Sequence, residues 1–189
     1  ALEGRRAYLF EGLENRPKSD QIDNFLLQLA RQARIPIPPV RPRSWREAFL
    51  LLHDVLRKAP GCVVLDEFQW MANYRREIVA DLKMSWDQYW SRVPGVSLIL
   101  SGSIASFMTT RVVKSNALYG RTDLVIHLKG FHLPETREML KGRGMDEVIE
   151  AQMYFGGVPK YLDLVRDGSS VRTAVEDLES RIHERFPQA

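Results

Sequence analysis

Two adjacent carboxylates follow directly after the run Cys62-Val63-Val64-Leu65, and no other residues in the sequence are better placed for chemistry. Four small or apolar residues in a row are typical of a buried strand in a parallel sheet. Such a strand would deliver Asp66 and Glu67 to the edge of the sheet where α/β proteins bind ligands. An aspartate there can hold hydrated Mg²⁺, and a neighbouring glutamate can polarise a water molecule. The alternative is that both acids only cap the next helix.

Three more polar residues lie downstream in positions where a phosphate could be bound. Ser101 and Ser103 flank Gly102 after the predicted strand Val96-Ser97-Leu98-Ile99-Leu100, so either hydroxyl could lie beside a terminal phosphate. Serine is also a preferred helix cap, which is the simpler interpretation. Arg121 could spread the negative charge of a phosphoryl transition state, or it could form a surface ion pair.

Other kinds of site find no support in the sequence. The histidines have no close His or Cys partner, so their spacing predicts no zinc site. There is no Gly-x-Ser-x-Gly elbow of a serine hydrolase and no glycine-rich phosphate loop ending in Lys-Ser or Lys-Thr. The run Gly156-Gly157-Val158-Pro159 breaks two helical patterns, and by itself it predicts only a turn between helices.

The candidate residues are positioned by segments that alternate between strand and helix. Alternation of this kind indicates an α/β fold with a parallel sheet and right-handed crossovers. Ser44-Trp45-Arg46-Glu47 has the form of a capping box and predicts a helix start. Strands are expected at residues 7–10, 62–65, 96–100 and 124–128, and helices at residues 22–33, 45–58, 74–90 and 105–113.

The pattern changes after Phe131, where only helices are expected. These are predicted at residues 134–141, 146–155, 161–165 and 171–186. We therefore expect two domains, an α/β core over residues 1–132 and a small all-α subdomain over residues 133–189.

The bulk composition is that of an ordinary globular protein. The chain has 189 residues, of which 44% are hydrophobic and 27% charged, and its formal net charge is +3. This mild excess of basic residues permits nucleic-acid binding without indicating it. The longest apolar stretch is far shorter than the roughly 20 residues of a membrane helix, so no membrane partner is expected. The single cysteine, Cys62, lies inside an apolar run, and a reducing cytoplasm is the expected compartment.

Taken in order, four segments resemble the archaeal-type ATPase family of the AAA+ superfamily, close to the STAND nucleotide switches. Val63–Trp70 resembles the Walker B segment, and Leu98–Met108 resembles the sensor-1 strand with its following helix. Tyr119–Thr122 resembles the arginine-bearing motif before the last core strand, and Tyr154–Leu162 resembles the Gly-x-Pro motif of the helical lid. The similarity runs from about Ala7 to about Val165.

The resemblance implies a P-loop NTPase fold, with a three-layer parallel-sheet core followed by an all-α lid, and it implies ATP and Mg²⁺ as ligands. It also implies a role for each matching residue. These roles are Mg²⁺ binding through water for Asp66, activation of the attacking water for Glu67, contact with the terminal phosphate for Ser101 or Ser103, an arginine finger or intramolecular sensor for Arg121, and an adenine pocket lined by Gly157 and Pro159.

The sequence departs from the family in the part that holds phosphate. Family members begin with a strand, a phosphate loop and its helix, whereas Glu3–Arg6 resembles only the tail of that helix. A C-terminal domain that could bind a DNA or protein client would be expected beyond Phe186. Without the loop, we expect this polypeptide to bind ATP weakly and to hydrolyse it negligibly. The missing strand would lie between those at Leu124 and Val96, so we expect these strands to pair directly or chains to associate through the exposed edges.

A second interpretation belongs to a different functional class. The chain could be a non-catalytic module for DNA or protein interaction that kept the scaffold without the phosphate loop. A Gly-x4-Gly-Lys-Ser/Thr motif encoded upstream of Ala1 would favour the ATPase. A nuclease is a third possibility, but it depends on Asp66 and Glu67 alone and lacks a third carboxylate at a suitable distance.

Overall fold

The chain folds into two contact-dense units, which are described separately. The computed structural model describes residues 6–73, 75, 77–115, 118–166 and 168–185. Contacts divide the chain into residues 1–125, here called the sheet unit, and residues 126–189, here called the helical unit. The sequence pattern predicts a subdomain boundary near Leu133. Among the described residues, no helix is long and apolar enough to cross a membrane.

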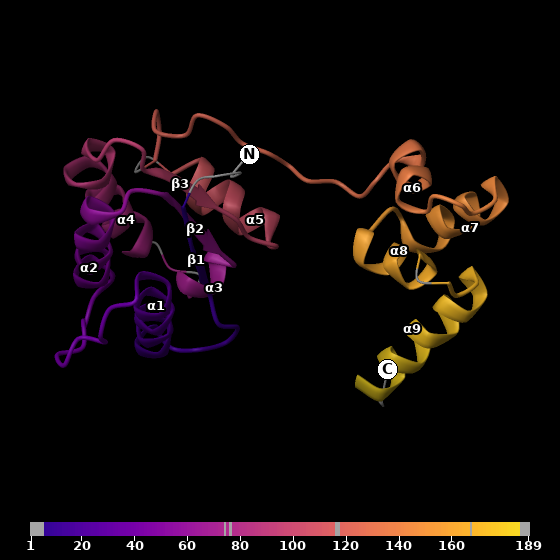
Figure 1. The fold of residues 1–189 in the computed structure, drawn as a ribbon, viewed down its shortest axis with the longest axis horizontal. Coiled ribbons are helices and arrows are strands. Elements are labelled where there is room, and N and C mark those ends of the chain that lie inside the picture. Colours follow the sequence, from indigo (N-terminus) through magenta and orange to yellow (C-terminus); the bar gives the residue numbers. More distant parts are fainter. Residues whose placement is uncertain (1–5, 74, 76, 116–117, 167, 186–189) are drawn as a thin grey trace. The chain divides into compact units, whose positions relative to one another are not determined.

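Among the described residues, three short parallel strands form the sheet in the order β1-β2-β3 (Figure 1). They are β1 (Ala7–Glu11), β2 (Cys62–Asp66) and β3 (Ser97–Leu100). The register aligns Leu65 of β2 with Phe10 on one side and with Leu100 on the other. Because all three strands run in the same direction, the residues that follow them meet at one edge of the sheet.

The two faces of the sheet differ in how well they are covered. Tyr8 and Phe10 of β1 and Val63 and Leu65 of β2 point to one side, where they are buried in the main hydrophobic core. The row Leu9–Val64–Ile99 lies on the opposite face, and there Leu9 remains 55% exposed and Ile99 43% exposed. Parallel sheets are normally covered on both faces, so this row is an unusual surface.

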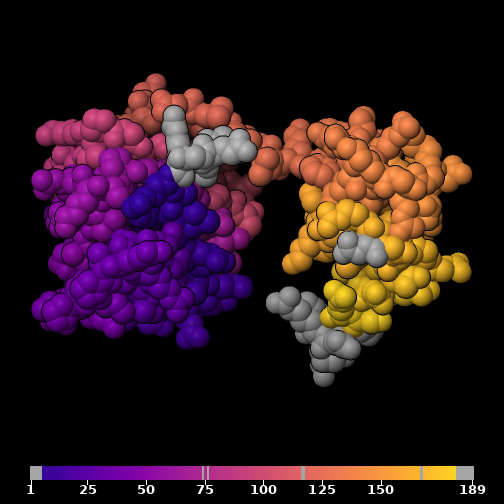
Figure 2. Space-filling model, viewed as in Figure 1, coloured from indigo at the N-terminus to yellow at the C-terminus, as the bar shows by residue number. Residues whose placement is uncertain are grey.

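Helices α1 (Lys18–Ala33), α2 (Trp45–Lys58) and α4 (Glu77–Gln88) enclose the core of the sheet unit. Figure 2 shows α1, α2 and the connector between them, in indigo and purple, as a continuous surface on the viewed side of this unit. The predicted cap of α2 is confirmed, since the Ser44 hydroxyl accepts from the Glu47 amide at 3.2 Å and Glu47 accepts from the Arg43 amide. Aromatic rings fill the space beneath, with Phe10 stacked on Phe25 at 4.2 Å between centroids.

Shorter elements complete the sheet unit. They are α3 (Phe68–Met71) after β2, the 3₁₀ turn η1 (Trp90–Arg92) before β3, and α5 (Ala105–Phe107) with the π-helix η2 (Met108–Val113) after β3. The helix expected over residues 105–113 is thus one turn of α-helix followed by a π-helix. Residues 74 and 76 of the helix expected at 74–90 lie outside the described residues.

The strand expected at residues 124–128 is not formed, and this prediction was wrong. The segment has no regular secondary structure and is exposed, and it pairs with none of the described strands. A strand is stable only when a neighbour satisfies its backbone N–H and C=O groups, and β3 is paired with β2 alone among the described residues. The expected direct pairing of this segment with the strand at Val96 is therefore also wrong within one chain.

The described residues of the helical unit form four helices around a small second core. They are α6 (Leu133–Met139), α7 (Met145–Phe155), α8 (Pro159–Arg166) and α9 (Val171–Arg185). Leu140, Val148, Phe155, Leu162 and Val165 are among the side chains buried in that core. The all-α character expected after Phe131 is present in the described residues.

Candidate functional site

The candidate site lies where β2 and β3 end side by side. The Ser101 amide donates to the carbonyl of Leu65 at 3.0 Å and thereby continues the ladder one residue beyond β3. This places the Ser101 hydroxyl next to Asp66, and it donates to Asp66 Oδ1 at 2.7 Å. The same oxygen accepts from the Glu67 amide at 2.9 Å. Asp66 is exposed, and its Oδ2 has no hydrogen-bond donor among the described residues, so that oxygen is available to a hydrated cation.

Glu67 is held in an unusual backbone conformation immediately after the strand. Its φ of 47° and ψ of 46° lie in the left-handed region, which non-glycine residues rarely adopt. The carboxylate Oε2 accepts from the Ser103 hydroxyl at 2.9 Å and also from the amide of Gln69. Left-handed residues that the surroundings hold in place are often found at functional sites. The side chain is therefore fixed by neighbours on both strand ends.

Gln69 is a member of this cluster that the sequence reasoning missed. It is fully buried, and its Nε2 donates to both Glu67 and Ser103, the latter at 3.1 Å. Its Oε1 is buried without a hydrogen-bond partner in the described structure. Gly102 packs against this oxygen, since a Cβ at Gly102 would lie 2.4 Å from Oε1. The signal in the sequence was a polar residue between the apolar Phe68 and Trp70, directly after the two carboxylates.

A cation at this cluster would need ligands besides the side chains of the described residues. No group of three or more His, Cys, Asp or Glu side chains gathers to form a metal cage in the described part of the chain. Mg²⁺ commonly keeps several waters and uses one or two carboxylates plus substrate phosphates, which suits Asp66. Glu67, the next residue, is a carboxylate that could act as a base on a water molecule at the same strand end.

Arg121 is engaged in an ion pair in this structure. Its Nε and Nη2 donate to the two carboxylate oxygens of Asp87 at 2.7 and 2.9 Å, and Lys83 also contacts Asp87 at 2.9 Å. These donors, first Arg121 and then Lys83, lower the pKa of Asp87 from 3.8 to about 2. This is the surface ion pair that was the alternative interpretation, and it fixes Arg121 to α4.

The Asp87 pair predicts a pH-dependent contribution to stability. Because folding lowers the pKa of Asp87, the pair stabilises the fold fully above about pH 4 and loses this effect as the pH falls towards 2. Asp87→Asn should therefore be less stable than the parent at about pH 6, with a difference that shrinks towards about pH 2.5. Urea titrations followed by tryptophan fluorescence would measure both differences. A stability difference between the parent and Asp87→Asn that did not change with pH would contradict the lowered pKa of Asp87.

Gly157 and Pro159 lie in the helical unit, where Gly157 has a clear packing role. Its φ is 73°, and a Cβ there would lie 2.0 Å from the carbonyl oxygen of Phe131. The Phe131 amide donates to the Gly157 carbonyl at 2.7 Å, and Gln152 donates to the Phe131 carbonyl at 3.0 Å. Pro159 is the first residue of α8, a position that suits proline. The structure brings Asp66, Glu67, Ser101 and Ser103 together; it does not position Gly157 or Pro159 relative to them.

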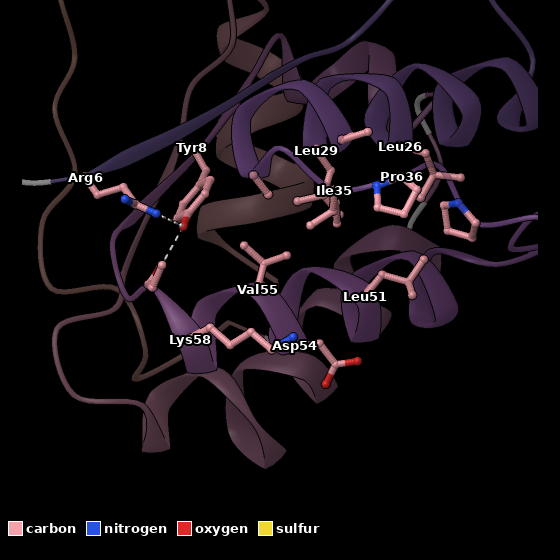
Figure 3. Close-up of a pocket in the computed structure, with 14 residues that line it drawn as sticks. Arg6, Tyr8, Leu26, Leu29, Ile35, Pro36, Leu51, Asp54, Val55 and Lys58 are labelled. Atoms are coloured by element: carbon pink, nitrogen blue, oxygen red, sulfur yellow. Dashed lines mark hydrogen bonds between the residues drawn. The ribbon is translucent and has the colours of Figure 1, made fainter.

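One cavity of the sheet unit lies away from these carboxylates. It has a volume of about 310 Å³ and lies between the C-terminal parts of α1 and α2. Figure 3 shows Leu26, Leu29, Ile35 and Val55 among its apolar lining residues, with the Tyr8 hydroxyl donating to the Ala59 carbonyl at 2.8 Å. None of the strand-end residues lines it. Most of the lining residues are apolar, with the charged Arg6, Asp54 and Lys58 among them.

Comparison with known proteins supports the fold. No family model and no curated protein matches the sequence. The chain is similar to a solved structure described as a Walker-type ATPase of Pyrococcus abyssi, with a TM-score of 0.61 and 19% sequence identity. The alignment covers 99% of this chain and 64% of that one, so this chain spans less than two thirds of the neighbour's length. At this identity the likeness concerns the α/β fold, which is that of a P-loop ATPase.

Proposed function

We propose that this chain is the Walker B and sensor part of an AAA+-type ATPase module that binds ATP and Mg²⁺. The observation that carries the proposal is the hydrogen bond between Ser101 and Asp66 at the ends of two adjacent parallel strands. It joins two sequence motifs that lie 35 residues apart. The carboxyl edge of an open parallel sheet is where such folds bind nucleotides.

Each residue of the cluster has a role in this proposal. Asp66 holds the hydrated cation through its free oxygen, and Glu67 orients the attacking water. Ser101 fixes the rotamer of Asp66, while Ser103 lies near the terminal phosphate and, with Gln69, holds Glu67. A bound Mg²⁺ would neutralise charge on the β- and γ-phosphates. Arg121 would serve as an arginine finger or sensor after leaving Asp87, and Gly157 with Pro159 would line the adenine pocket.

The proposal predicts weak nucleotide binding by the 189-residue chain alone. Backbone amides and a lysine of a phosphate loop hold the β- and γ-phosphates in P-loop ATPases, and the sequence contains no such motif. Isothermal titration calorimetry with Mg-ATP should give a dissociation constant weaker than about 0.1 mM. We expect the chain to release no more phosphate from ATP than its Glu67→Gln variant does. Micromolar affinity would contradict this account of where phosphate is held.

A further inference from the structure

The cavity between α1 and α2 has the size and the lining of a small-molecule site. Its volume of about 310 Å³ lies at the lower end of the range of roughly 300 to 1,000 Å³ found for ligand pockets. All but three of its lining residues are apolar or aromatic, and Leu26, Leu29 and Val55 among them are buried. A cavity of about 150 Å³ lined by such residues can hold benzene, so this one has room for an alkyl chain of roughly ten carbons.

The connector between α1 and α2 forms a third wall of the cavity, and both of its ends are joined to α1. At one end the Ile35 amide donates to the Ala30 carbonyl at 3.1 Å. Near the other end Arg41 forms an ion pair with Asp23 at 2.5 Å. Pro36 lines the cavity, and its ring fixes its own φ and keeps Ile35 out of the helical region. The wall is therefore in place before a ligand binds, which reduces the entropy that binding would cost.

The charged residues that line the cavity carry an excess of positive charge. Arg6, Asp54 and Lys58 are exposed, unlike the apolar walls (Figure 3). A second cavity, of about 260 Å³, shares Asp54 and Lys58 with the first and adds Arg57. Arg6 donates to the Tyr8 hydroxyl at 3.5 Å, but none of these four charged groups forms an ion pair with a described residue. Three cations thus accompany one carboxylate, and this balance favours an anionic ligand.

We propose that the cavity binds an aliphatic carboxylate of about ten carbons, which is the chemistry of a medium-chain fatty acid. The alkyl chain lies against Leu26, Leu29 and Val55, and the carboxylate lies near Arg57 and Lys58 where the two cavities meet. None of the strand-end residues of the candidate site lines this cavity. The inference therefore goes beyond the proposed nucleotide function and does not depend on it.

Titration of the 189-residue chain with decanoate tests the proposal, with the methyl NMR signals of Leu26, Leu29 and Val55 as the readout. We expect saturable shifts of these signals and a dissociation constant of about 0.1 to 1 mM, because a ligand of so few atoms binds weakly. Decylammonium has the same chain with the opposite charge and should bind at least tenfold more weakly. Absence of saturable shifts, or tighter binding of decylammonium than of decanoate, would overturn the proposal.

Ala30→Phe should close the cavity. Ala30 lines it from α1, and a phenyl ring there would occupy the space of the alkyl chain, so we expect decanoate binding to weaken at least tenfold. The matched control is Leu27→Phe, which adds a ring to the exposed side of the same helix and should bind decanoate like the parent. Tryptophan fluorescence checks that both variants are folded. A folded Ala30→Phe variant with unchanged affinity would overturn the proposed position of the alkyl chain.

Charge variants test the position of the carboxylate and need no change in the packing of α1. Replacing Arg57 and Lys58 together by glutamine should weaken decanoate binding about tenfold. Replacing Arg92 and Lys114 together by glutamine removes the same charges from exposed positions that do not line the cavity, and it should leave the affinity unchanged. Equal effects of the two double variants would overturn the assignment. Absence of decanoate binding leaves the proposed function unaffected, and weak Mg-ATP binding leaves this inference unaffected.

Discussion

Replacing Gly157 by alanine is expected to lower the free energy of unfolding of the helical unit by about 3 kcal/mol or more. A Cβ at this position would meet the carbonyl oxygen of Phe131 at 2.0 Å and its amide nitrogen at 2.7 Å. Both are backbone atoms fixed by hydrogen bonds to Gly157 and Gln152, so they cannot move without breaking those bonds. Hydrogen exchange of the amides in α7 and α8 measures the loss.

Gly156→Ala is the matched control for this variant. Gly156 is also in the left-handed region, with φ 58°, but a Cβ there would meet no atom within 4 Å. The Gly156→Ala substitution should therefore lower the free energy of unfolding by only about 1 kcal/mol, which is the cost of holding an alanine in the left-handed conformation. Every tryptophan lies within residues 1–125, so tryptophan fluorescence should report an unchanged transition for the sheet unit in both variants. Equal losses for the two variants would contradict the proposed clash.

Gly12→Ala should have the second large effect, and it acts on the loop that carries the carboxylates. A Cβ at Gly12 would lie 2.6 Å from the Glu67 carbonyl oxygen and 2.9 Å from the Met71 amide nitrogen. The Gly12 amide also donates to the Asp66 carbonyl at 3.0 Å. We expect a loss of about 3 kcal/mol in the sheet unit, measured by urea unfolding with tryptophan fluorescence. The end of β1 thus helps to fix the backbone of Asp66 and Glu67.

Gly102→Ala provides the comparison for Gly12. Its Cβ would approach only side-chain atoms, Gln69 Oε1 at 2.4 Å and Met108 Sδ at 3.0 Å. Side chains can turn away more easily than backbone, and Met108 is flexible, so a loss of about 1 to 2 kcal/mol is expected. If Gly102→Ala lowered the free energy of unfolding more than Gly12→Ala does, the expected order of the two variants would be contradicted.

Local patterns in the sequence predicted most of the helices and three of the strands. The apolar spacing of α1 and α2 and the cap at Ser44 depend on residues near one another in the chain, so they can be identified without tertiary information. The meeting of Asp66 with Ser101 was also predictable, because parallel strands end at one edge. The strand predicted at residues 124–128 is not formed, because an apolar pattern in the sequence does not supply a partner strand.

Other features of the site depend on tertiary contacts that a sequence does not show. The buried amide of Gln69 acquires its role only when Ser103 is brought beside Glu67 across two strands. Arg121 could have faced a phosphate or a carboxylate, and the choice of Asp87 follows from the position of α4. The contact of Gly157 with Phe131 likewise joins segments 26 residues apart, which no local pattern reveals.

Paramagnetic relaxation by Mn²⁺ tests the central claim, that Asp66 and its neighbours form a cation site for a nucleotide. Substoichiometric Mn²⁺ with ATP should broaden the amide signals of Glu67 and Ser101 before others, since Mn²⁺ shares the preference of Mg²⁺ for oxygen ligands. Asp66→Asn should abolish this broadening, whereas Asp123→Asn, which alters another exposed carboxylate, should not. Broadening centred elsewhere, or unchanged in Asp66→Asn, would contradict the claim.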